Sequence, residues 1–204
     1  AGARSAFLTK SLVKSARDIR VDHIVLLDND QQKLKTYGEI SRELARRLDP
    51  DLTFEVTSDA RAALTGVDYI ITTIRAGEDA GRLFDEQTCL AHGVLGQETT
   101  GAGGFAMAIR SVPTLVYYCT LAREVANPGH LIFNFTNPSG IITQALRSKG
   151  FDNVYGICDA PSGFIKQLEE ILERARSGED FATLVSQYNE DPGLTEDGYY
   201  FGPG

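Results

Sequence analysis

The chain has 204 residues, of which 42% are hydrophobic and 24% charged, and its formal net charge is −8. This composition is typical of a globular protein that can bury a core. The acidic balance argues against a nucleic-acid or anionic-membrane partner, because such partners bind clustered Lys and Arg side chains. No apolar run approaches the length of a membrane span, and the N-terminus lacks a signal-peptide pattern. Three widely spaced cysteines do not indicate a disulfide framework, so we expect a reducing, cytoplasmic location.

Strand-like and helix-like stretches alternate along the chain. Short β-branched or apolar runs, typical of buried parallel strands, lie at 23–28, 52–56, 67–74, 130–135 and 153–158. Helical patterns follow them at about 31–47, 78–91, 105–125, 139–148 and 162–176. This alternation predicts an α/β fold, namely a Rossmann-like, doubly wound and mostly parallel sheet flanked by helices. A short helical or loop tail is expected at the C-terminus.

The pattern of the first residues, with Gly2, predicts a glycine turn that opens a helix. In a doubly wound nucleotide-binding fold, such a turn follows a central strand and lets a pyrophosphate approach the helix N-terminus. No such strand precedes Gly2, so we expect a sheet that lacks its first strand. Asp28 has roughly the spacing of the acid that accepts hydrogen bonds from the adenosine ribose. Its alternative role is to cap the helix that starts near Gln31.

Five motifs occur in one consistent order. They are AGARSAFLTKSL at the N-terminus, TIRAG (73–77), GQETTGAGGF (96–105), NFTNPSG (134–140) and GICDAP (156–161). Together they resemble glycoside hydrolase family 4, whose members are NAD- and divalent-metal-dependent enzymes that act mostly on 6-phosphoglycosides. The similarity runs from residue 1 to about 172, which predicts a Rossmann-like NAD-binding domain over 1–172.

The resemblance implies roles for several residues near the nicotinamide and the sugar. Glu98 would line the sugar site, and Arg75 would hold the phosphosugar, although Arg75 also fits an ordinary surface cation. Asn137 would contact both cofactor and substrate at the carboxyl edge of the sheet, where open α/β folds bind ligands. Its alternative role is an Asn-Pro helix start. Asn134 would support the same loop by hydrogen bonding.

Cys158 matches the metal-binding cysteine of the family, although a lone Cys at a strand end is more often a buried small hydrophobe. Asp159 follows it, and an acid at this position protonates the leaving oxygen in some members. A metal-supporting or helix-capping carboxylate is equally plausible for Asp159, given Pro161. The cofactors implied are NAD and Mn²⁺, and the substrate is a phosphorylated sugar.

The implied mechanism differs from the two-carboxylate scheme of most glycosidases. NAD⁺ takes a hydride from C3 of the sugar, and Mn²⁺ polarises the resulting ketone and acidifies the C2 proton. A base removes that proton, the aglycone leaves C1, water adds and the hydride returns. The family's second metal ligand, a His, lies in a later region, together with its Tyr base and a phosphate-binding Arg. All three histidines here precede Cys158, so we expect this chain to be inactive as a glycosidase.

The C-terminal segment differs from that family. Residues 175–204 resemble part of a parvulin-type peptidyl-prolyl isomerase, which predicts a parvulin-like fragment or tail over 173–204. Two alternative functions remain open: an NAD-dependent dehydrogenase of the lactate/malate superfamily, and a non-catalytic chimera or fragment. The sequence leaves self-association into a homo-oligomer open.

Overall fold

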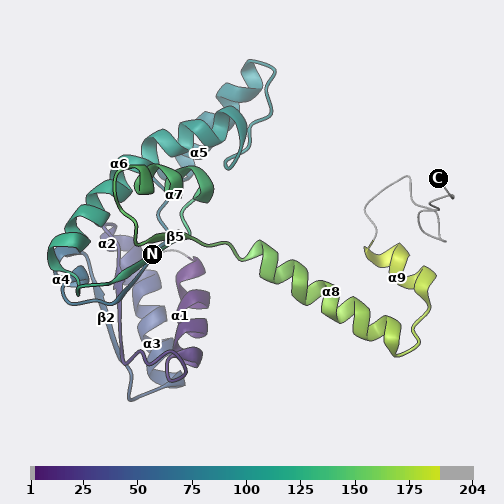
Figure 1. Cartoon of the computed structure of the whole chain (residues 1–204), viewed down its shortest axis with the longest axis horizontal. Helices are drawn as coiled ribbons and strands as arrows, with labels where there is room; N and C mark the ends of the chain where they lie inside the picture. Colours follow the sequence, from purple (N-terminus) through teal and green to yellow (C-terminus); the bar gives the residue numbers. More distant parts are fainter. Residues whose placement is uncertain (1–2, 189–204) are drawn as a thin grey trace. The chain divides into compact units, whose positions relative to one another are not determined.

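The computed structural model describes residues 3–188 of the chain (Figure 1). It divides into two units, Ala1–Ile157 and Cys158–Gly204. The first unit contains α1 (Ala3–Ser15), β1 (His23–Leu27), α2 (Gln31–Lys33), the π-helical turn η1 (Leu34–Gly38), α3 (Glu39–Leu48), β2 (Thr53–Thr57), α4 (Ala60–Leu64), β3 (Tyr69–Thr72), α5 (Glu78–Ala91), α6 (Gly101–Val125), β4 (Leu131–Asn134), α7 (Ser139–Ser148) and β5 (Val154–Gly156). The second unit contains α8 (Ala160–Arg176) and α9 (Phe181–Tyr188).

All strand pairs in the described residues are parallel, which confirms the predicted α/β, Rossmann-like class. β1 pairs with β2 with His23 opposite Thr53. β4 lies between β3 and β5, with Ile132 opposite Ile70 on one side and Val154 on the other. These pairings make two sheets, β1-β2 and β3-β4-β5, rather than one. The division falls between β1 and β3, where a doubly wound sheet has its first strand.

The main core of the first unit lies between α6, α7 and the three-stranded sheet. Its buried residues are Leu64, Leu115, Cys119, Leu121, Ala122, Ile132, Ile142, Leu146, Phe151 and Val154. β4 (Leu131–Asn134) is the central strand of this sheet, because it pairs with β3 on one edge and with β5 on the other. A central parallel strand is buried, which explains its short, mostly apolar sequence. Burial of these side chains is the main stabilising term for the unit.

The long apolar helix α6 bears on the expectation that the chain has no membrane span. Among the described residues, this one helix is long and apolar enough to cross a membrane by length and composition. Its apolar length has another explanation in the structure, because Leu115, Cys119 and Ala122 are almost completely buried in the core. α6 also carries Arg110 and Arg123, whose side chains bond to other parts of the first unit. α6 is the core helix of this unit.

The helical stretch predicted to run to Arg47 is divided into three parts. Asp30 caps α2, since its Oδ1 accepts from the backbone N of Gln32 at 2.9 Å and of Lys33 at 3.0 Å. The π-helical turn η1 then leads into α3, which packs against α1 (Figure 1). Gly38 ends η1, where an added Cβ would lie 2.7 Å from Cγ1 of Val56. A side chain at this position would therefore separate the helices from β2.

The second unit is a pair of helices joined by a short turn. Arg174 near the end of α8 donates to Glu179 in the turn, with Nε 2.7 Å from Oε2, and to the Tyr188 hydroxyl in α9 at 2.7 Å. Only residues 175–188 of the parvulin-like segment are described, and 189–204 lie outside the described residues. The resemblance and the domain boundary at 172 both remain predictions.

Candidate active site

Two threonines join the carboxyl ends of β3 and β4. Thr136 is almost completely buried, and its Oγ1 accepts from the backbone N of Ile74 at 2.9 Å. The same hydroxyl donates to Oγ1 of Thr72 at 3.4 Å. Arg75 and Asn137 each follow one residue after this link. The Thr136 contacts therefore bring both residues to the same edge of the sheet, where open α/β folds bind their ligands.

A fully buried amide holds the turn between β4 and α7. Oδ1 of Asn134 accepts from Oγ1 of Thr72 at 3.0 Å and from the backbone N of Thr136 at 3.2 Å. Its Nδ2 donates to Oγ1 of Thr143 at 3.2 Å and to the backbone oxygens of Thr136 and Ser139 at 3.3 and 3.4 Å. Every polar atom of this side chain has a partner, as buried polar groups require. The supporting role predicted for Asn134 is confirmed.

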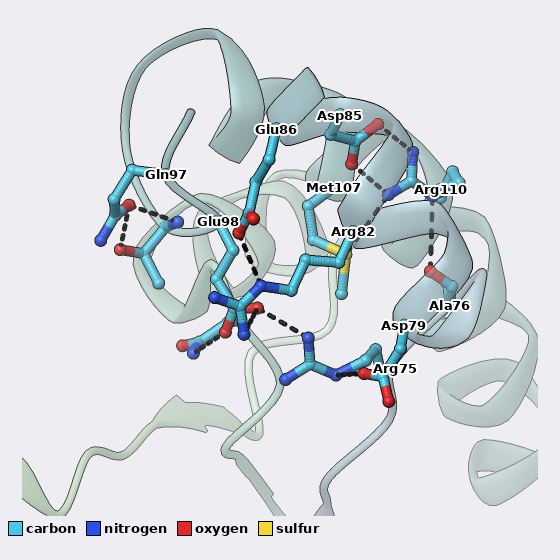
Figure 2. Close-up of polar contacts among 12 residues, drawn as sticks. Arg75, Ala76, Asp79, Arg82, Asp85, Glu86, Gln97, Glu98, Met107 and Arg110 are labelled. Carbon is cyan, nitrogen blue, oxygen red and sulfur yellow. Dashed lines mark hydrogen bonds and ion pairs between the residues drawn. The ribbon is translucent and has the colours of Figure 1, made fainter. Parts of the chain in front are cut away.

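Glu98 lies at the centre of the polar cluster in Figure 2. Its Oε2 accepts from NH1 of Arg75 at 2.7 Å and lies 3.4 Å from NH1 of Arg82. Its Oε1 accepts from Nδ2 of Asn137 at 3.4 Å. The structure thus brings together Arg75, Glu98 and Asn137, three residues that the sequence singled out separately, and adds Arg82.

The charges around Glu98 determine its protonation. Burial by itself would raise the pKa of this carboxyl, since its side chain is only 18% exposed. The charge and hydrogen bond of Arg75, the hydrogen bond from Asn137 and the charge of Arg82 outweigh burial and lower the pKa below its usual value of 4.5. Glu98 is therefore ionised at neutral pH and acts as a hydrogen-bond acceptor.

The glycine-rich stretch supports Glu98 through close backbone contacts. α6 begins at Gly101, four residues before its predicted start at Phe105. An added Cβ would lie 2.6 Å from the backbone oxygen of Gln97 at Gly103, and 2.7 Å from the backbone C of Thr99 at Gly104. The loop that carries Glu98 therefore packs directly on the first turn of α6, and side chains at these two positions would push it away.

A second ion pair joins this region to α6. NH1 of Arg110 donates to Oδ1 of Asp85 at 2.8 Å, and NH2 donates to Oδ2. Nε of Arg110 donates to the backbone oxygen of Ala76 at 3.4 Å (Figure 2). Because Asp85 lies on α5 and Ala76 follows Arg75, this one guanidinium connects α6 to both segments that carry the site arginines.

The cluster carries more acid than base. Nε of Arg82 donates to Oε1 of Glu86 at 2.6 Å, and Nε of Arg75 lies 3.8 Å from Oδ1 of the exposed Asp79. Two guanidiniums therefore face three carboxylates, counting Glu98. A ligand phosphate at this place has to compete with Glu86 and Asp79 for the arginines, whereas ligand hydroxyl groups meet a ready acceptor in Glu98.

Arg82, Thr136 and the pair of Asp85 and Arg110 were not predicted from the sequence. Residues three and four apart lie on one face of a helix, so the spacing of Arg82, Asp85 and Glu86 was a usable signal. No local pattern indicates that Thr136 or Arg110 reaches across to β3 and α5, because those contacts depend on the tertiary fold.

The cofactor residues predicted near the N-terminus are only partly described. Gly2 lies outside the described residues. Oδ1 of Asp28 accepts from the backbone N of Asp30 at 2.8 Å, and Asp30, rather than Asp28, caps α2. The capping alternative for Asp28 is therefore wrong, and its role toward a ribose stays a prediction.

Cys158 and Asp159 belong to the second unit. Cys158 is exposed, so its alternative as a buried hydrophobe is wrong. Asp159 occupies the N-cap position of α8 but makes no side-chain capping bond, so the capping alternative is not supported. Within residues 3–188, no group of three or more His, Cys, Asp or Glu side chains is placed to hold a metal ion. The metal-ligand role of Cys158 and the proton-donor role of Asp159 stay predictions.

Residues 1–174 match the family described as family 4 glycosyl hydrolase. The chain belongs to this family. The match covers all the motifs that line the cluster around Glu98, and it confirms the resemblance seen in the sequence. It favours family 4 over the alternative of an NAD-dependent dehydrogenase of the lactate/malate superfamily.

Curated relatives in family 4 include enzymes named for both glucoside anomers. A 6-phospho-beta-glucosidase, BglT, of Thermotoga maritima is 36% identical over 167 residues, which are 81% of this chain and 39% of the relative. A phospho-alpha-glucosidase, PagL, of Clostridium acetobutylicum is 38% identical over 142 residues, which are 68% of this chain and 32% of the relative. The chain spans about a third to two fifths of the length of these family 4 relatives.

Parts of solved phosphoglucosidase structures superpose on most of this chain. The 6-phospho-beta-glucosidase of Thermotoga maritima with NAD and glucose-6-phosphate superposes with a TM-score of 0.78 and 31% identity, covering 84% of this chain and 41% of that one. A 6-phospho-alpha-glucosidase from gut microorganisms, in complex with NAD and Mn²⁺, gives a TM-score of 0.78 at 30% identity, covering 84% of this chain and 40% of that one.

Proposed function

We propose that this chain forms the NAD-binding part of a family 4 6-phospho-glycosidase, together with part of its phosphosugar site. The observation that carries the proposal is the convergence of Arg75, Arg82 and Asn137 on Glu98 at the carboxyl edge of the β3-β4-β5 sheet. It is supported by the family relatives, which are named as phosphoglucosidases and were solved with NAD, Mn²⁺ and glucose-6-phosphate.

Each residue of the cluster has a role that its chemistry suits. Arg75 and Arg82 would bind the sugar phosphate, because guanidinium groups match phosphate oxygens geometrically. The ionised Glu98 would accept hydrogen bonds from sugar hydroxyls, and Asn137 would orient both Glu98 and the nicotinamide. Bound NAD⁺ supplies the hydride acceptor for the sugar.

The adenosine half of the cofactor would be held near the N-terminal part of the chain. Asp28 would accept from the ribose hydroxyls and repel a 2′-phosphate, which gives a preference for NAD⁺ over NADP⁺. Gly2 would let the pyrophosphate approach the helix that follows it. Asp28 stands directly after β1, at the carboxyl end that such cofactors approach.

The second unit would contribute Cys158 as one ligand of Mn²⁺ and Asp159 as the group that protonates the leaving oxygen. The described residues do not complete a Mn²⁺ site with Cys158, and a divalent ion requires several ligands. Because the described residues also contain no assigned base for the sugar C2 proton, we propose that this chain by itself does not hydrolyse phosphoglycosides. A cytoplasmic location and the absence of nucleic-acid or membrane partners complete the proposal.

Calorimetric titration of the chain with NAD⁺, NADP⁺ and glucose 6-phosphate tests this function. We expect NAD⁺ to bind more tightly than NADP⁺, and Arg82→Gln to weaken glucose 6-phosphate selectively. Arg46→Gln on the exposed face of α3 is the matched control. Equal binding of NADP⁺ would contradict the role of Asp28, and glucose 6-phosphate affinity unchanged by Arg82→Gln would contradict that of the cluster.

A turnover assay tests the proposed inactivity. The chain is incubated with NAD⁺, Mn²⁺, a reductant and a nitrophenyl 6-phosphoglucoside of either anomer. We expect no nitrophenol above the level without enzyme, because a positioned base is typically worth about 10²–10⁴-fold in rate. Release that depends on both cofactors would show that the chain holds a complete site.

A further inference from the structure

A four-residue turn, 75–78, follows β3 and leads into α5. The backbone N of Glu78 donates to the backbone oxygen of Arg75 at 3.2 Å and closes the turn. Gly77 and Glu78 both have a left-handed backbone, with φ of 81° and 53°. Glycine adopts this conformation freely, whereas a residue with a side chain does so at a cost. Contacts from outside the turn must therefore hold it, because strained backbone persists only where its surroundings fix it.

The side chain of Arg110 on α6 lies against this turn (Figure 2). Its Nε donates to the backbone oxygen of Ala76 at 3.4 Å. An added Cβ would lie 3.0 Å from this Nε at Gly77 and 3.3 Å from it at Gly81. The two glycines therefore leave the space that the guanidinium occupies, and a side chain at either position would crowd it.

Asp85 fixes the direction of the same guanidinium. Both terminal nitrogens of Arg110 donate to the Asp85 carboxylate, which is 7% exposed. Such a bidentate pair sets the plane of the guanidinium as well as its distance. With NH1 and NH2 held by Asp85, Nε is the donor that meets the turn at Ala76. An ion pair alone would require only Asp85, so the Nε bond and the two glycines point to a second role.

The turn connects Arg110 to the cluster around Glu98. Arg75 directly precedes Ala76, so their Cα atoms are about 3.8 Å apart and move together. The other end of Arg75 donates to Oε2 of Glu98 at 2.7 Å, a charge-assisted bond whose strength depends on its geometry. Within residues 3–188, the side-chain hydrogen bonds and ion pairs of Glu98 come from Arg75, Arg82 and Asn137. Arg110 therefore acts on Glu98 through the turn.

We propose that Arg110 is a positioning residue for the phosphosugar site, and that it fixes the 75–78 turn so that Arg75 reaches Glu98. The inference rests on the proposed function, in which Arg75 binds the sugar phosphate. Arg110 does not contact the substrate, because its donors are directed to Asp85 and Ala76. Its contribution is to hold the Arg75 guanidinium in place before the phosphate arrives, which lowers the cost of ordering the site on binding.

Calorimetric titration of the full 204-residue chain with glucose 6-phosphate and with NAD⁺ tests this role. Asp85→Leu/Arg110→Met removes the anchor without leaving a buried charge, so the fold should be retained. We expect this double variant to bind glucose 6-phosphate about tenfold more weakly, which is roughly the loss of one charge-assisted hydrogen bond. NAD⁺ affinity should stay unchanged. Unchanged glucose 6-phosphate affinity, or an equal loss for both ligands, would overturn the positioning role.

Arg123→Met is the matched control for the double variant. Arg123 lies on the same helix and also donates to a backbone oxygen, that of Gly150 at 2.7 Å. Its contact is with the segment between α7 and β5, away from the 75–78 turn. We expect Arg123→Met to bind both ligands like the unmodified chain. A loss of glucose 6-phosphate affinity as large as that of the double variant would show that any weakening of α6 has this effect, and the inference would fall.

A measurement without ligand separates this inference from the proposed function. The pKa of Glu98 is lowered by Arg75, Asn137 and Arg82, and not by Arg110 directly. NMR titration of the Glu98 carboxyl carbon should therefore show a higher pKa in the double variant and no change in Arg123→Met. An unchanged pKa in the double variant overturns the inference. If this pKa rises but the unmodified chain does not bind glucose 6-phosphate, the proposed function falls while the hold of Arg110 on Arg75 stands.

Gly81→Ala decides the matter if the double variant does not fold. Alanine favours the helix α5, while its Cβ would lie 3.3 Å from Nε of Arg110 and displace the guanidinium. We expect the pKa of Glu98 to rise and glucose 6-phosphate to bind more weakly, both by less than in the double variant. Gly140→Ala, with nothing within 4 Å of its Cβ position, is the control. Identical results for the two alanine variants would overturn the inference.

Discussion

The Arg110 guanidinium donates two parallel hydrogen bonds to the Asp85 carboxylate and so joins α6 to α5. Asp85 is 7% exposed. Arg110→Met would leave this carboxylate buried without a partner, and we expect it to lower the free energy of unfolding by about 3 kcal/mol. Urea denaturation measures the change.

The control for this pair is Arg46→Met, which removes an exposed pair with Glu43 on α3. Exposed pairs contribute about 0–1 kcal/mol, so this variant should remain close to the unmodified chain. The double variant Asp85→Leu/Arg110→Met should recover much of the loss, because it removes both charges. Similar unfolding of Arg110→Met and Arg46→Met would contradict a stabilising role for the buried pair.

Gly103→Ala tests whether close packing explains the glycine-rich motif. The new Cβ would lie 2.6 Å from the backbone oxygen of Gln97, so the loop or the helix has to move. We expect a loss of about 1–3 kcal/mol in the free energy of unfolding. Gly140→Ala is the matched control, because nothing lies within 4 Å of its Cβ position in α7. Alanine there should be neutral or stabilise by up to about 1 kcal/mol.

Asn134→Asp tests the buried amide at the end of β4. The substitution keeps the shape of the side chain but replaces a donor that faces three acceptors. We expect a loss of about 2–3 kcal/mol, since each unsatisfied buried group costs a large part of its desolvation. Asn127→Ala, which loses one exposed bond to Asp68, should cost far less. Equal losses in the two variants would show that burial does not strengthen the network.

The protonation of Glu98 gives a pH prediction. Its pKa in the folded chain is lowered, so the bonds to Arg75 and Asn137 stabilise the fold fully above about pH 4.5 and are lost as the pH falls through the lower folded pKa. In Arg75→Gln, less positive charge opposes the effect of burial on Glu98, so the pKa of Glu98 should rise. NMR titration of the Glu98 carboxyl carbon measures this pKa in the unmodified chain and in Arg75→Gln. A midpoint unchanged by the substitution would exclude Arg75 as a cause.

The three cysteines should differ in reactivity. Cys158 is exposed, whereas Cys89 and Cys119 are buried. Burial raises the pKa of the Cys119 thiol to about 11, which keeps it protonated and unreactive at pH 8. Iodoacetamide at pH 8, followed by mass spectrometry, should modify Cys158 alone, and all three cysteines once the chain is unfolded in urea. Modification of Cys119 in the folded chain would indicate that the core between α6 and β4 opens.

Much of the fold could be predicted because its signals are local. The strands at 23–28 and 130–135 are short apolar runs, and the helix at 139–148 was predicted with the bounds that the structure has. Helix ends were less accurate where backbone packing determines them. α6 starts at Gly101 because the glycines accept the backbone of the preceding loop, a contact that periodicity does not encode.

The candidate site could be predicted only in part. Arg75, Glu98 and Asn137 lie in motifs, and the structure brings them into contact. Arg82 joins them because α5 turns it toward Glu98, and Thr136 aligns the two strand ends through a hydroxyl bond across the sheet. Such contacts between segments far apart in the chain follow from the tertiary arrangement and not from any local pattern.

The division of the strands into two sheets affects how the protein behaves at high concentration. Within residues 3–188, five strands in two sheets present four lateral edges, whereas one five-stranded sheet would present two. Unpaired edges expose backbone donors and acceptors that can pair with an extended peptide or with a neighbouring molecule. We therefore expect light scattering to increase steeply with protein concentration. It should fall when a soluble β-strand peptide is added, because the peptide would pair with these edges.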